Sequence, residues 1–330
     1  MYHGRRKRIL GWLEIQFMRS GMSVRILICD PVDDEGIKRM KREGFKVDVK
    51  PSIAEEELEE IVSRYDALIV RSRTKVTREI VERAKRLKVI GRAGAGLDNI
   101  DMEAADEKRV TVLNTPEAPA DSVAELTVGL MLALVRKIAL ADSSLKNGRW
   151  LKKELEGSLL KGKTLGLVGL GNIGMRVAEI AKEIGMRILV TKRTPPSREL
   201  LERLGAEFVP LEELLRRSDI VSVHVPLTQE TRRMIGAREL NLMKEGSYLV
   251  NTSRGGIVDE NALAGALVCG RLAGAALDVF ETEPLRNPEL VKMPNVLCTP
   301  HIGAQTVEAQ KAASTLLADK IVKFFKDRVP

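Results

Sequence analysis

Short apolar runs alternate along the chain with segments in which apolar residues recur every three or four positions. In the first third of the chain, the apolar runs predict buried strands, and the segments between them predict amphipathic helices. The expected strands are Val24–Cys29, Val47–Val49, Ala67–Val70, Val89–Arg92 and Thr111–Asn114. The expected helices are Glu35–Glu43, Glu55–Ser63 and Thr77–Ala84. Strands and helices that alternate in this way predict a parallel sheet with helices on its faces.

A second series of strands and helices follows in the other half of the chain. Its expected strands are Thr164–Val168, Arg187–Val190, Glu207–Val209, Ile220–His224, Ser247–Asn251, Ala273–Asp278 and Val296–Cys298. Between the two series, the pattern predicts one long helix over Ser122–Lys146, in which Ser122-Val-Ala-Glu125 has the form of a capping box. The last expected helix is Thr306–Lys326. The predicted fold class is α/β, with two doubly wound, Rossmann-like parallel-sheet domains.

The expected domains divide the chain discontinuously. Pro116 and Pro119 mark a hinge-like boundary before the long helix. We expect residues 23–118 plus 302–330 to form one domain and residues 119–301 the other. Residues 1–22 are expected to be a basic N-terminal extension. Two interpretations of it stay open: a flexible, disordered arm, or an upstream start codon with Met18 or Met22 as the true start.

Charge and apolar run length restrict the class of protein. The 330 residues carry 54 Lys and Arg against 46 Asp and Glu, a formal net charge of +8. Half of this excess lies in the first 21 residues, so the charge does not indicate a nucleic-acid partner. The longest apolar run, Leu126–Val135, is too short for a bilayer, which needs about 20 residues. Because Glu14 and Gln16 interrupt any signal-peptide core, we expect a cytoplasmic protein with no membrane partner.

Three cysteines stand far apart in apolar surroundings. Their odd number and wide spacing predict neither a disulfide framework nor a metal site.

A glycine-rich turn follows the expected strand Thr164–Val168 and reads Gly169-Leu-Gly171-Asn-Ile-Gly174. A helical pattern begins directly behind it, and this strand–turn–helix setting is typical of a dinucleotide site. Gly169 permits the tight turn, Gly171 lets the backbone approach a pyrophosphate, and Gly174 allows close packing of the helix on the strand. A glycine turn without a ligand is the alternative.

The end of the next expected strand bears on the cofactor. NAD sites usually place an acid there to bind the ribose hydroxyls, but no acid occurs between Glu183 and Glu199. Lys192 and Arg193 stand at that position instead, and two cations suit a 2′-phosphate. The cofactor is therefore predicted to be NAD(H) or NADP(H), with NADP(H) slightly favoured. The alternative is a solvated basic turn.

Three further motifs carry a family resemblance: Asn251-Thr-Ser-Arg254-Gly-Gly-Ile-Val-Asp-Glu260, Leu277-Asp278-Val-Phe-Glu-Thr-Glu283-Pro284 and Thr299-Pro300-His301-Ile-Gly-Ala304. With them the chain resembles the D-isomer-specific 2-hydroxyacid dehydrogenases over nearly everything after Val24. Within that family it is most similar to the short form of the D-3-phosphoglycerate dehydrogenases. We expect the chain to lack the regulatory C-terminal domain of the longer forms, and therefore expect no serine feedback through such a domain.

The resemblance implies that Arg254, Glu283 and His301 are the catalytic residues. The residue chemistry agrees, because a planar guanidinium can bind a 2-keto carboxylate with two hydrogen bonds. An imidazole can donate and recover a proton near pH 7, and a neighbouring carboxylate favours its charged form. His224, at the end of a strand, is the alternative acid/base, but the resemblance gives it a packing role beside the nicotinamide.

The resemblance also implies which residues bind the ligands. Backbone N–H groups of Gly94, Ala95 and Gly96 would hold the substrate anion, and Arg71, Ser72 and Arg73 would reach the substrate. Either both arginines reach one phosphate, or one binds substrate and the other is solvated. The family's acidic ribose ligand falls on Lys192, a departure from the family pattern. The implied cofactor contacts are Ala95, Gly169, Gly171, Asn172, Ile173, Gly174, Lys192, Arg193, Val225, Thr252, Ser253, Asp278, Gly303 and Ala304.

These features predict an NAD(P)-dependent dehydrogenase for a small, anionic D-2-hydroxy acid, with D-3-phosphoglycerate as the first candidate, as in serine biosynthesis. The alternatives are a glyoxylate or hydroxypyruvate reductase and, in another class, a nucleotide-sensing protein similar to the transcriptional corepressors related to this family. From the resemblance we also expect a homodimer formed through the long helix. It further implies that residues 23–118 plus 302–330 bind the substrate, that residues 119–301 bind the dinucleotide, and that the active site lies in a cleft between the two domains.

Overall fold

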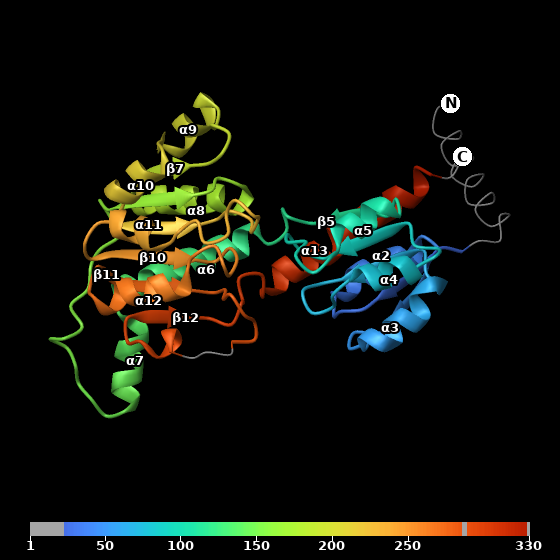
Figure 1. Cartoon of the computed structure of the whole chain (residues 1–330), viewed down its shortest axis with the longest axis horizontal. Helices are drawn as coiled ribbons and strands as arrows, with labels where there is room; N and C mark the ends of the chain where they lie inside the picture. The colour runs from blue at the N-terminus through green and yellow to red at the C-terminus, as the bar shows by residue number, and fades with distance from the viewer. Residues whose placement is uncertain (1–22, 286–288, 329–330) are drawn as a thin grey trace, which may run out of the picture. The chain divides into compact units, whose positions relative to one another are not determined.

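The structure, a computed structural model, describes residues 23–285 and 289–328. The predicted N-terminal extension, residues 1–22, lies outside the described residues. The described chain divides into two compact units, one running up to Ala118 and resuming at Gln310, the other comprising Pro119–Ala309. Residues 302–309, expected in the first domain, thus group with the second unit. Both units are parallel-sheet α/β domains of the Rossmann-like class (Figure 1).

The first unit contains a five-stranded parallel sheet in the order β2-β1-β3-β4-β5. The strands are β1 (Arg25–Ile28), β2 (Lys46–Val49), β3 (Ala67–Val70), β4 (Val89–Arg92) and β5 (Thr111–Asn114). The helices are α2 (Asp34–Arg42), α3 (Glu55–Ile61), η1 (Val62–Arg64), α4 (Arg78–Arg83), α5 (Met102–Glu107) and α13 (Val307–Lys326), the last of which enters this unit at Gln310. Because successive strand residues face opposite sides, Leu27 packs in one apolar core and Ile26 in the other. Helices cover both faces, which explains why the strands are continuous apolar runs.

The second unit contains a seven-stranded parallel sheet in the order β12-β11-β10-β9-β6-β7-β8. The strands are β6 (Thr164–Val168), β7 (Arg187–Thr191), β8 (Ala206–Phe208), β9 (Ile220–Val223), β10 (Ser247–Asn251), β11 (Leu272–Leu277) and β12 (Val296–Cys298). The helices are α6 (Ala120–Val135), α7 (Ile138–Lys146), α8 (Asn172–Ile184), α9 (Arg198–Leu204), α10 (Leu211–Arg217), α11 (Ala237–Leu242), α12 (Glu260–Val268) and η2 (Leu290–Lys292). From β6 the chain moves outward to β8 and then returns to β9 on the other side of β6. Ligands of such sheets bind at the carboxyl ends of the strands where this reversal occurs.

The prediction of one long helix over Ser122–Lys146 is wrong. Helix α6 ends at Val135 and α7 begins at Ile138, with Lys137 in a left-handed conformation at φ 52°. The Ser158 N–H donates to the Val135 carbonyl at 3.0 Å, and the Lys137 ammonium donates to the Glu154 carbonyl at 3.0 Å. A later segment of the chain therefore satisfies the carbonyl that would otherwise continue the helix.

The predicted capping box is wrong as well. Helix α6 begins at Ala120, so Ser122 lies inside its first turn. The Ser122 hydroxyl donates to the carbonyl of Gly303 at 2.6 Å, a contact with a residue 181 positions later.

None of the described helices is long and apolar enough to cross a membrane.

Candidate active site

Two glycines of the turn after β6 are required by close packing. Gly169 has φ 104°, and a Cβ atom there would lie 2.7 Å from the carbonyl oxygen of His224. A Cβ atom at Gly174 would lie 2.5 Å from the carbonyl oxygen of Gly169. Val225 borders the same turn, since its Cγ1 atom would be 3.0 Å from a Cβ at Gly169. These contacts hold the start of α8 against β6 and β9.

Gly171 is different, because a Cβ atom there would meet no described atom within 4 Å. Gly171 is the N-cap of α8 and is exposed, as is Asn172. Within the described chain, no side chain caps this helix end. The N–H groups of the first turn, which include those of Asn172 and Ile173, therefore have no side-chain cap among the described residues at the positive end of the helix dipole. This arrangement fits the pyrophosphate of a dinucleotide.

The predicted ribose position lies beside this turn. The N–H of Gly169 donates to the carbonyl of Thr191, the last residue of β7, at 2.9 Å. Lys192 and Arg193 follow directly and are exposed. The pKa of Glu230 is lowered, first by the hydroxyl of Thr228 and to a smaller degree by the charge of Arg193. Two exposed cations thus stand at the end of β7, and their contact with a 2′-phosphate stays a prediction.

His301 and Glu283 form a hydrogen-bonded pair in the second unit. The Nδ1 atom of His301 lies 2.7 Å from Oε2 of Glu283. The other carboxylate oxygen, Oε1, accepts the N–H of Phe280 at 3.0 Å. Partial burial raises the pKa of Glu283, but the hydrogen bonds from His301 and Phe280 and the charge of Arg254 outweigh burial and lower it. The ionised carboxylate therefore orients the imidazole through Nδ1 and leaves Nε2 as the atom that can exchange a proton.

Arg254 lies in the turn that follows β10. The Asn251 side chain fixes this turn, since its Nδ2 donates to the Arg254 carbonyl at 2.9 Å. A Cβ atom at Gly255 would overlap the carbonyl of Phe280, so the Arg254 turn packs directly on the segment that carries Glu283. The structure thus brings Arg254, Glu283 and His301 together. Gly255 was not predicted as a functional residue, although its place next to Arg254 was a signal.

A buried carboxylate, that of Asp278, shapes the loop of His301. It accepts the Thr299 hydroxyl at 2.6 Å and the N–H groups of Ile302 and Gly303 at 2.8 and 2.9 Å. The Asp278 carbonyl accepts the N–H of His301 at 2.8 Å, and His301 has φ 52°. The side chain of Asp278 and the N–H of Gly303 therefore hold the loop, whereas we predicted them as cofactor contacts. Ala304, the next residue, is half-buried.

Two further predicted cofactor residues also bond within the protein. The Thr252 hydroxyl lies 2.8 Å from that of Thr127, whose proton goes to the carbonyl of Val123 at 2.7 Å. Thr252 is therefore the donor, because each hydroxyl has one proton. The Ser253 hydroxyl donates to Oδ1 of Asn251 at 2.7 Å. These side chains shape the strand end, and their contact with a cofactor stays a prediction.

His224 does not have the environment of a proton donor. Its Nε2 lies 2.8 Å from the Ser222 hydroxyl, and its Nδ1 is buried without a hydrogen-bond partner among the described residues. Burial lowers the pKa of His224 to about 4, so the ring is neutral at pH 7. Of the two histidines that the sequence left as candidates, only His301 has a carboxylate partner in the described chain.

In the first unit, the structure gives the two arginines different roles. The Nε atom of Arg73 lies 3.0 Å from Oδ1 of the fully buried Asp30, and its Nη2 donates to the carbonyl of Cys29 at 2.7 Å. The backbone N–H of Arg71 donates to Oδ2 of Asp30 at 2.5 Å. The Nη1 atom of its guanidinium donates to the carbonyl of Pro31 at 3.3 Å. Arg73 is thus a structural residue rather than the predicted substrate ligand. Arg71 and the exposed Ser72 remain candidates.

The loop of Gly94, Ala95 and Gly96, which we predicted to bind the substrate anion, also forms hydrogen bonds within the protein. The N–H of Gly94 donates to the Thr115 hydroxyl at 2.9 Å, so this group is not available to the substrate as predicted. The carbonyl of Ala95 accepts the side-chain amide of Asn114 at 2.7 Å. The N–H groups of Ala95 and Gly96 remain candidates for the carboxylate.

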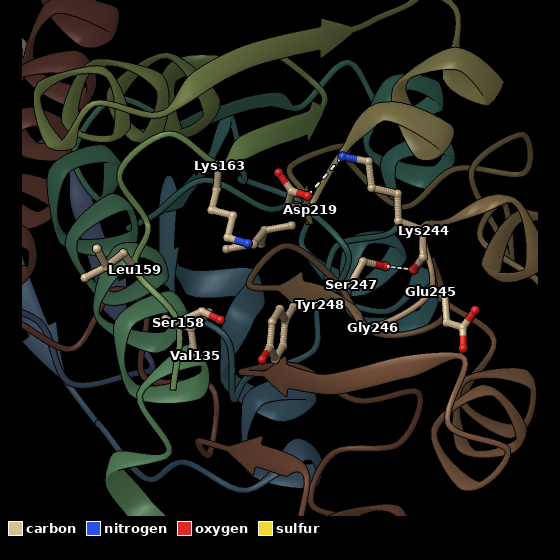
Figure 2. A pocket seen from close by; sticks show the side chains of 11 residues that line it. Val135, Ser158, Leu159, Lys163, Asp219, Lys244, Glu245, Gly246, Ser247 and Tyr248 are labelled. Carbon is tan, nitrogen blue, oxygen red and sulfur yellow. Dashed lines mark hydrogen bonds and ion pairs between the residues drawn. The ribbon is translucent and has the colours of Figure 1, made fainter. Parts of the chain in front are cut away.

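A small pocket of about 150 Å³ lies at the opposite, amino-terminal edge of the seven-stranded sheet (Figure 2). Lys163, Asp219 and Tyr248 line it at the starts of β6, β9 and β10. The Lys244 ammonium donates to Asp219 at 2.9 Å. None of the predicted site residues lines this pocket.

Comparison with known proteins decides the family. Residues 128–303 match the family described as D-isomer specific 2-hydroxyacid dehydrogenase, NAD binding domain. The chain belongs to this family. Its predicted membership and its Rossmann-like fold are thereby confirmed.

Members of the D-isomer specific 2-hydroxyacid dehydrogenase family match the chain over most of its length. It is 49% identical to the D-3-phosphoglycerate dehydrogenase of Methanocaldococcus jannaschii, over 92% of this chain and 58% of that protein. The chain therefore spans little more than half the length of this relative. It is 47% identical to the hydroxypyruvate reductase of Thermotoga maritima, over 91% of this chain and 97% of that protein. A crystal structure of a glyoxylate reductase from Paecilomyes thermophila has a TM-score of 0.84 and 32% identity, over 91% of this chain and 94% of that one.

Proposed function

We propose that this protein is an NAD(P)-dependent dehydrogenase that interconverts a D-2-hydroxy acid and the corresponding 2-keto acid. The observation that carries the proposal is the 2.7 Å pair of His301 and Glu283 beside the turn of Arg254. A structural histidine or a lone surface arginine would not account for this combination at the carboxyl ends of β10–β12.

Each of the three residues has a distinct part in the proposed reaction. A nicotinamide dinucleotide held at the glycine turn would supply the hydride chemistry. Arg254 binds the carboxylate of the acid with its planar guanidinium and stabilises the negative charge at the neighbouring carbonyl oxygen. His301 donates a proton to that oxygen in reduction and accepts it in oxidation. Glu283 holds the imidazole in the tautomer that this exchange requires.

We propose NADP(H) as the preferred cofactor. Lys192 and Arg193 support this preference, since both follow β7 beside the glycine turn and neither has an ion pair with a described residue within 4 Å. A 2′-phosphate would form charge-assisted hydrogen bonds with them.

For the substrate, D-3-phosphoglycerate and its keto acid, 3-phosphohydroxypyruvate, are the first candidate. The 49% identity to a D-3-phosphoglycerate dehydrogenase supports this candidate. Arg71 is the residue that we expect to bind the phosphate, because part of its guanidinium remains available.

Hydroxypyruvate or glyoxylate is the second candidate. It is favoured by the internal contacts of Arg73, which leave one arginine in this segment for a substrate phosphate. The hydroxypyruvate reductase of Thermotoga maritima also matches this chain over nearly its whole length.

We further propose that the protein is a homodimer. Four large apolar side chains between residues 138 and 159 are more than half exposed: Ile138 at 52%, Leu145 at 57%, Trp150 at 79% and Leu159 at 70%. They lie on α7 and on the loop after it, which extends away from the seven-stranded sheet (Figure 1). Several large, exposed apolar side chains within one short stretch of the chain favour an interface there.

Initial rates with 3-phosphohydroxypyruvate, hydroxypyruvate and glyoxylate, each with NADH and NADPH, test the proposal. The Arg71→Ala variant separates the two substrates, since a phosphate contact predicts a large loss with 3-phosphohydroxypyruvate and a small loss with glyoxylate. Cofactor binding without turnover of any of these acids would instead favour a nucleotide-sensing protein.

A further inference from the structure

The segment 280–283, which carries Glu283, is held from two sides. On one side the carbonyl of Phe280 lies against Gly255, at the Arg254 turn. On the other side the N–H of Glu281 donates to Oε1 of Glu260 at 2.6 Å. Glu260 is the first residue of α12 and is half-buried. The segment therefore lies between the turn of one catalytic residue and the start of a helix.

Glu260 is not needed to cap its own helix. The carboxylate of Asp259 already accepts the N–H groups of Asn261 and Ala262, each at 3.0 Å. The carboxylate of Glu260 instead accepts a hydrogen bond from the N–H of Glu281, which lies 21 positions later in the chain. A hydrogen bond between a backbone N–H and a carboxylate is charge-assisted, and such bonds are about twice as strong as neutral ones.

Glu260 lies among other acidic residues. The nearby cation, Arg233, pairs with those residues and not with Glu260. Arg233 approaches the carboxylates of Asp259 at 3.9 Å and Glu281 at 3.5 Å, while its N–H donates to the carbonyl of Gly256 at 2.7 Å. Among the described residues, Glu260 has no ion pair of its own within 4 Å. Burial and the charges of Glu281, Asp259 and Glu283 raise its pKa, which is a cost of placing a carboxylate there. The carboxylate nevertheless lies within hydrogen-bond distance of the N–H of Glu281, at 2.6 Å.

We propose that Glu260 is a positioning residue for the catalytic pair. Its carboxylate fixes the 280–283 segment against the Arg254 turn and so keeps Glu283 within hydrogen-bond distance of His301. This inference rests on the proposed function, since the pair has a catalytic role only if the protein is a dehydrogenase. Loss of the bond would let Glu283 move, and a misplacement of about 1 Å at a catalytic group can cost roughly 10²-fold in rate.

Three substitutions separate the reach of the side chain from its charge. Glu260→Gln removes the charge and keeps an acceptor at the same distance, whereas Glu260→Asp keeps the charge and withdraws the acceptor by one methylene. Glu260→Ala removes both. We expect Glu260→Asp and Glu260→Ala to lower kcat by roughly tenfold to a hundredfold with an unchanged KM for the cofactor, and Glu260→Gln to retain most of kcat. Glu245→Ala, at the opposite edge of the same sheet, is the charge-matched control and should keep the wild-type kcat.

A spectroscopic measurement gives a readout that does not depend on turnover. In proton NMR, the Nδ1–H of His301 in its bond to Glu283 should give a downfield resonance, which is assigned by its absence in His301→Ala. We expect this resonance in the wild type and in Glu260→Gln, and its loss or broadening in Glu260→Asp and Glu260→Ala. Because aspartate is favourable in the first turn of a helix, Glu260→Asp should stay folded even if Glu260→Ala does not.

The outcomes distinguish this inference from the proposed function. If the wild type reduces none of the keto acids, the proposed function fails, and the resonance still tests the positioning of His301 and Glu283. If the wild type is active and Glu260→Asp keeps both its kcat and the resonance, the inference is overturned. A Glu260→Gln variant that loses as much kcat as Glu260→Ala would also overturn it, since the acceptor would then not be what matters.

Discussion

His301 has a left-handed backbone conformation, and its imidazole is hydrogen-bonded to the carboxylate of Glu283. This combination indicates a catalytic role rather than a packing role. We predict that His301→Ala lowers kcat by ~10²–10⁴-fold, the usual loss when a general acid–base is removed. The dissociation constant of the cofactor, measured by fluorescence, should change little, because the imidazole does not hold the pyrophosphate. Full activity in this variant would move the role to His224.

His224 predicts a pH dependence of stability. Its pKa is lowered from 6.5 to about 4 in the folded protein, so between these values the unfolded state binds a proton that the folded state does not. Stability contributed by the neutral ring is therefore fully present above pH 6.5 and is lost as pH falls through about 4. The loss should be on the order of 3 kcal/mol. Urea unfolding of the wild type and of His224→Asn from pH 7 to 4 measures this effect, and equal slopes in the two proteins would contradict it.

At the scale of an element, two glycines of the turn between β6 and α8 have different roles. Gly169 is needed for folding, and Gly171 is needed for a ligand. Gly169→Ala should lower the free energy of unfolding by about 1–3 kcal/mol, because its Cβ meets the His224 carbonyl and its φ is positive. Gly171→Ala should leave the thermal midpoint nearly unchanged and weaken cofactor binding, since its Cβ would occupy open space at the helix end. Calorimetry with and without cofactor tests the pair. Unaltered cofactor affinity in Gly171→Ala would show that the pyrophosphate does not lie there.

The end of β7 carries the prediction on cofactor choice. Two charge-assisted hydrogen bonds, each worth ~1.5–3 kcal/mol against phosphate, predict a preference for NADPH of roughly tenfold to a hundredfold after screening at an exposed turn. The preference should decrease as salt is raised. Lys192→Asp should reverse it by repelling the phosphate and offering the ribose an acceptor. A wild type that favours NADH, with dissociation constants that Lys192→Asp does not move, would show that the turn points away from the ribose.

At the scale of the whole molecule, the exposed apolar residues of α7 and the following loop predict the oligomeric state. Sedimentation of the wild type should give a dimer, and the double variant Leu145→Glu/Trp150→Glu should give a monomer, because two buried charges without partners destabilise an interface. Val268→Glu is the matched control, since Val268 is 78% exposed on α12, outside this segment. A double variant that sediments like the wild type would place the interface elsewhere.

The sequence by itself determined the elements whose signal is local. Strands Ala67–Val70 and Thr164–Val168 were predicted to the residue, because a strand buried on both faces must be a continuous apolar run. The glycine turn and the motifs of Arg254, Glu283 and His301 were readable for a similar reason, since their chemistry depends on residue type at fixed spacing. The short helix α5 was missed, although α4, of the same length, was predicted.

Only the tertiary structure decided which groups are free to act. Arg71 and Arg73 stand in the same short motif, and the contacts of the Arg73 guanidinium with the buried Asp30 and the carbonyl of Cys29 make Arg73 structural. The N–H of Gly94 was predicted for the substrate and is taken by Thr115, while Ser122 bonds to Gly303 rather than capping its helix. Helix α6 ends at Val135 because Ser158 returns to its carbonyl. In each case the deciding partner lies more than 20 residues away along the chain, beyond the reach of any local pattern.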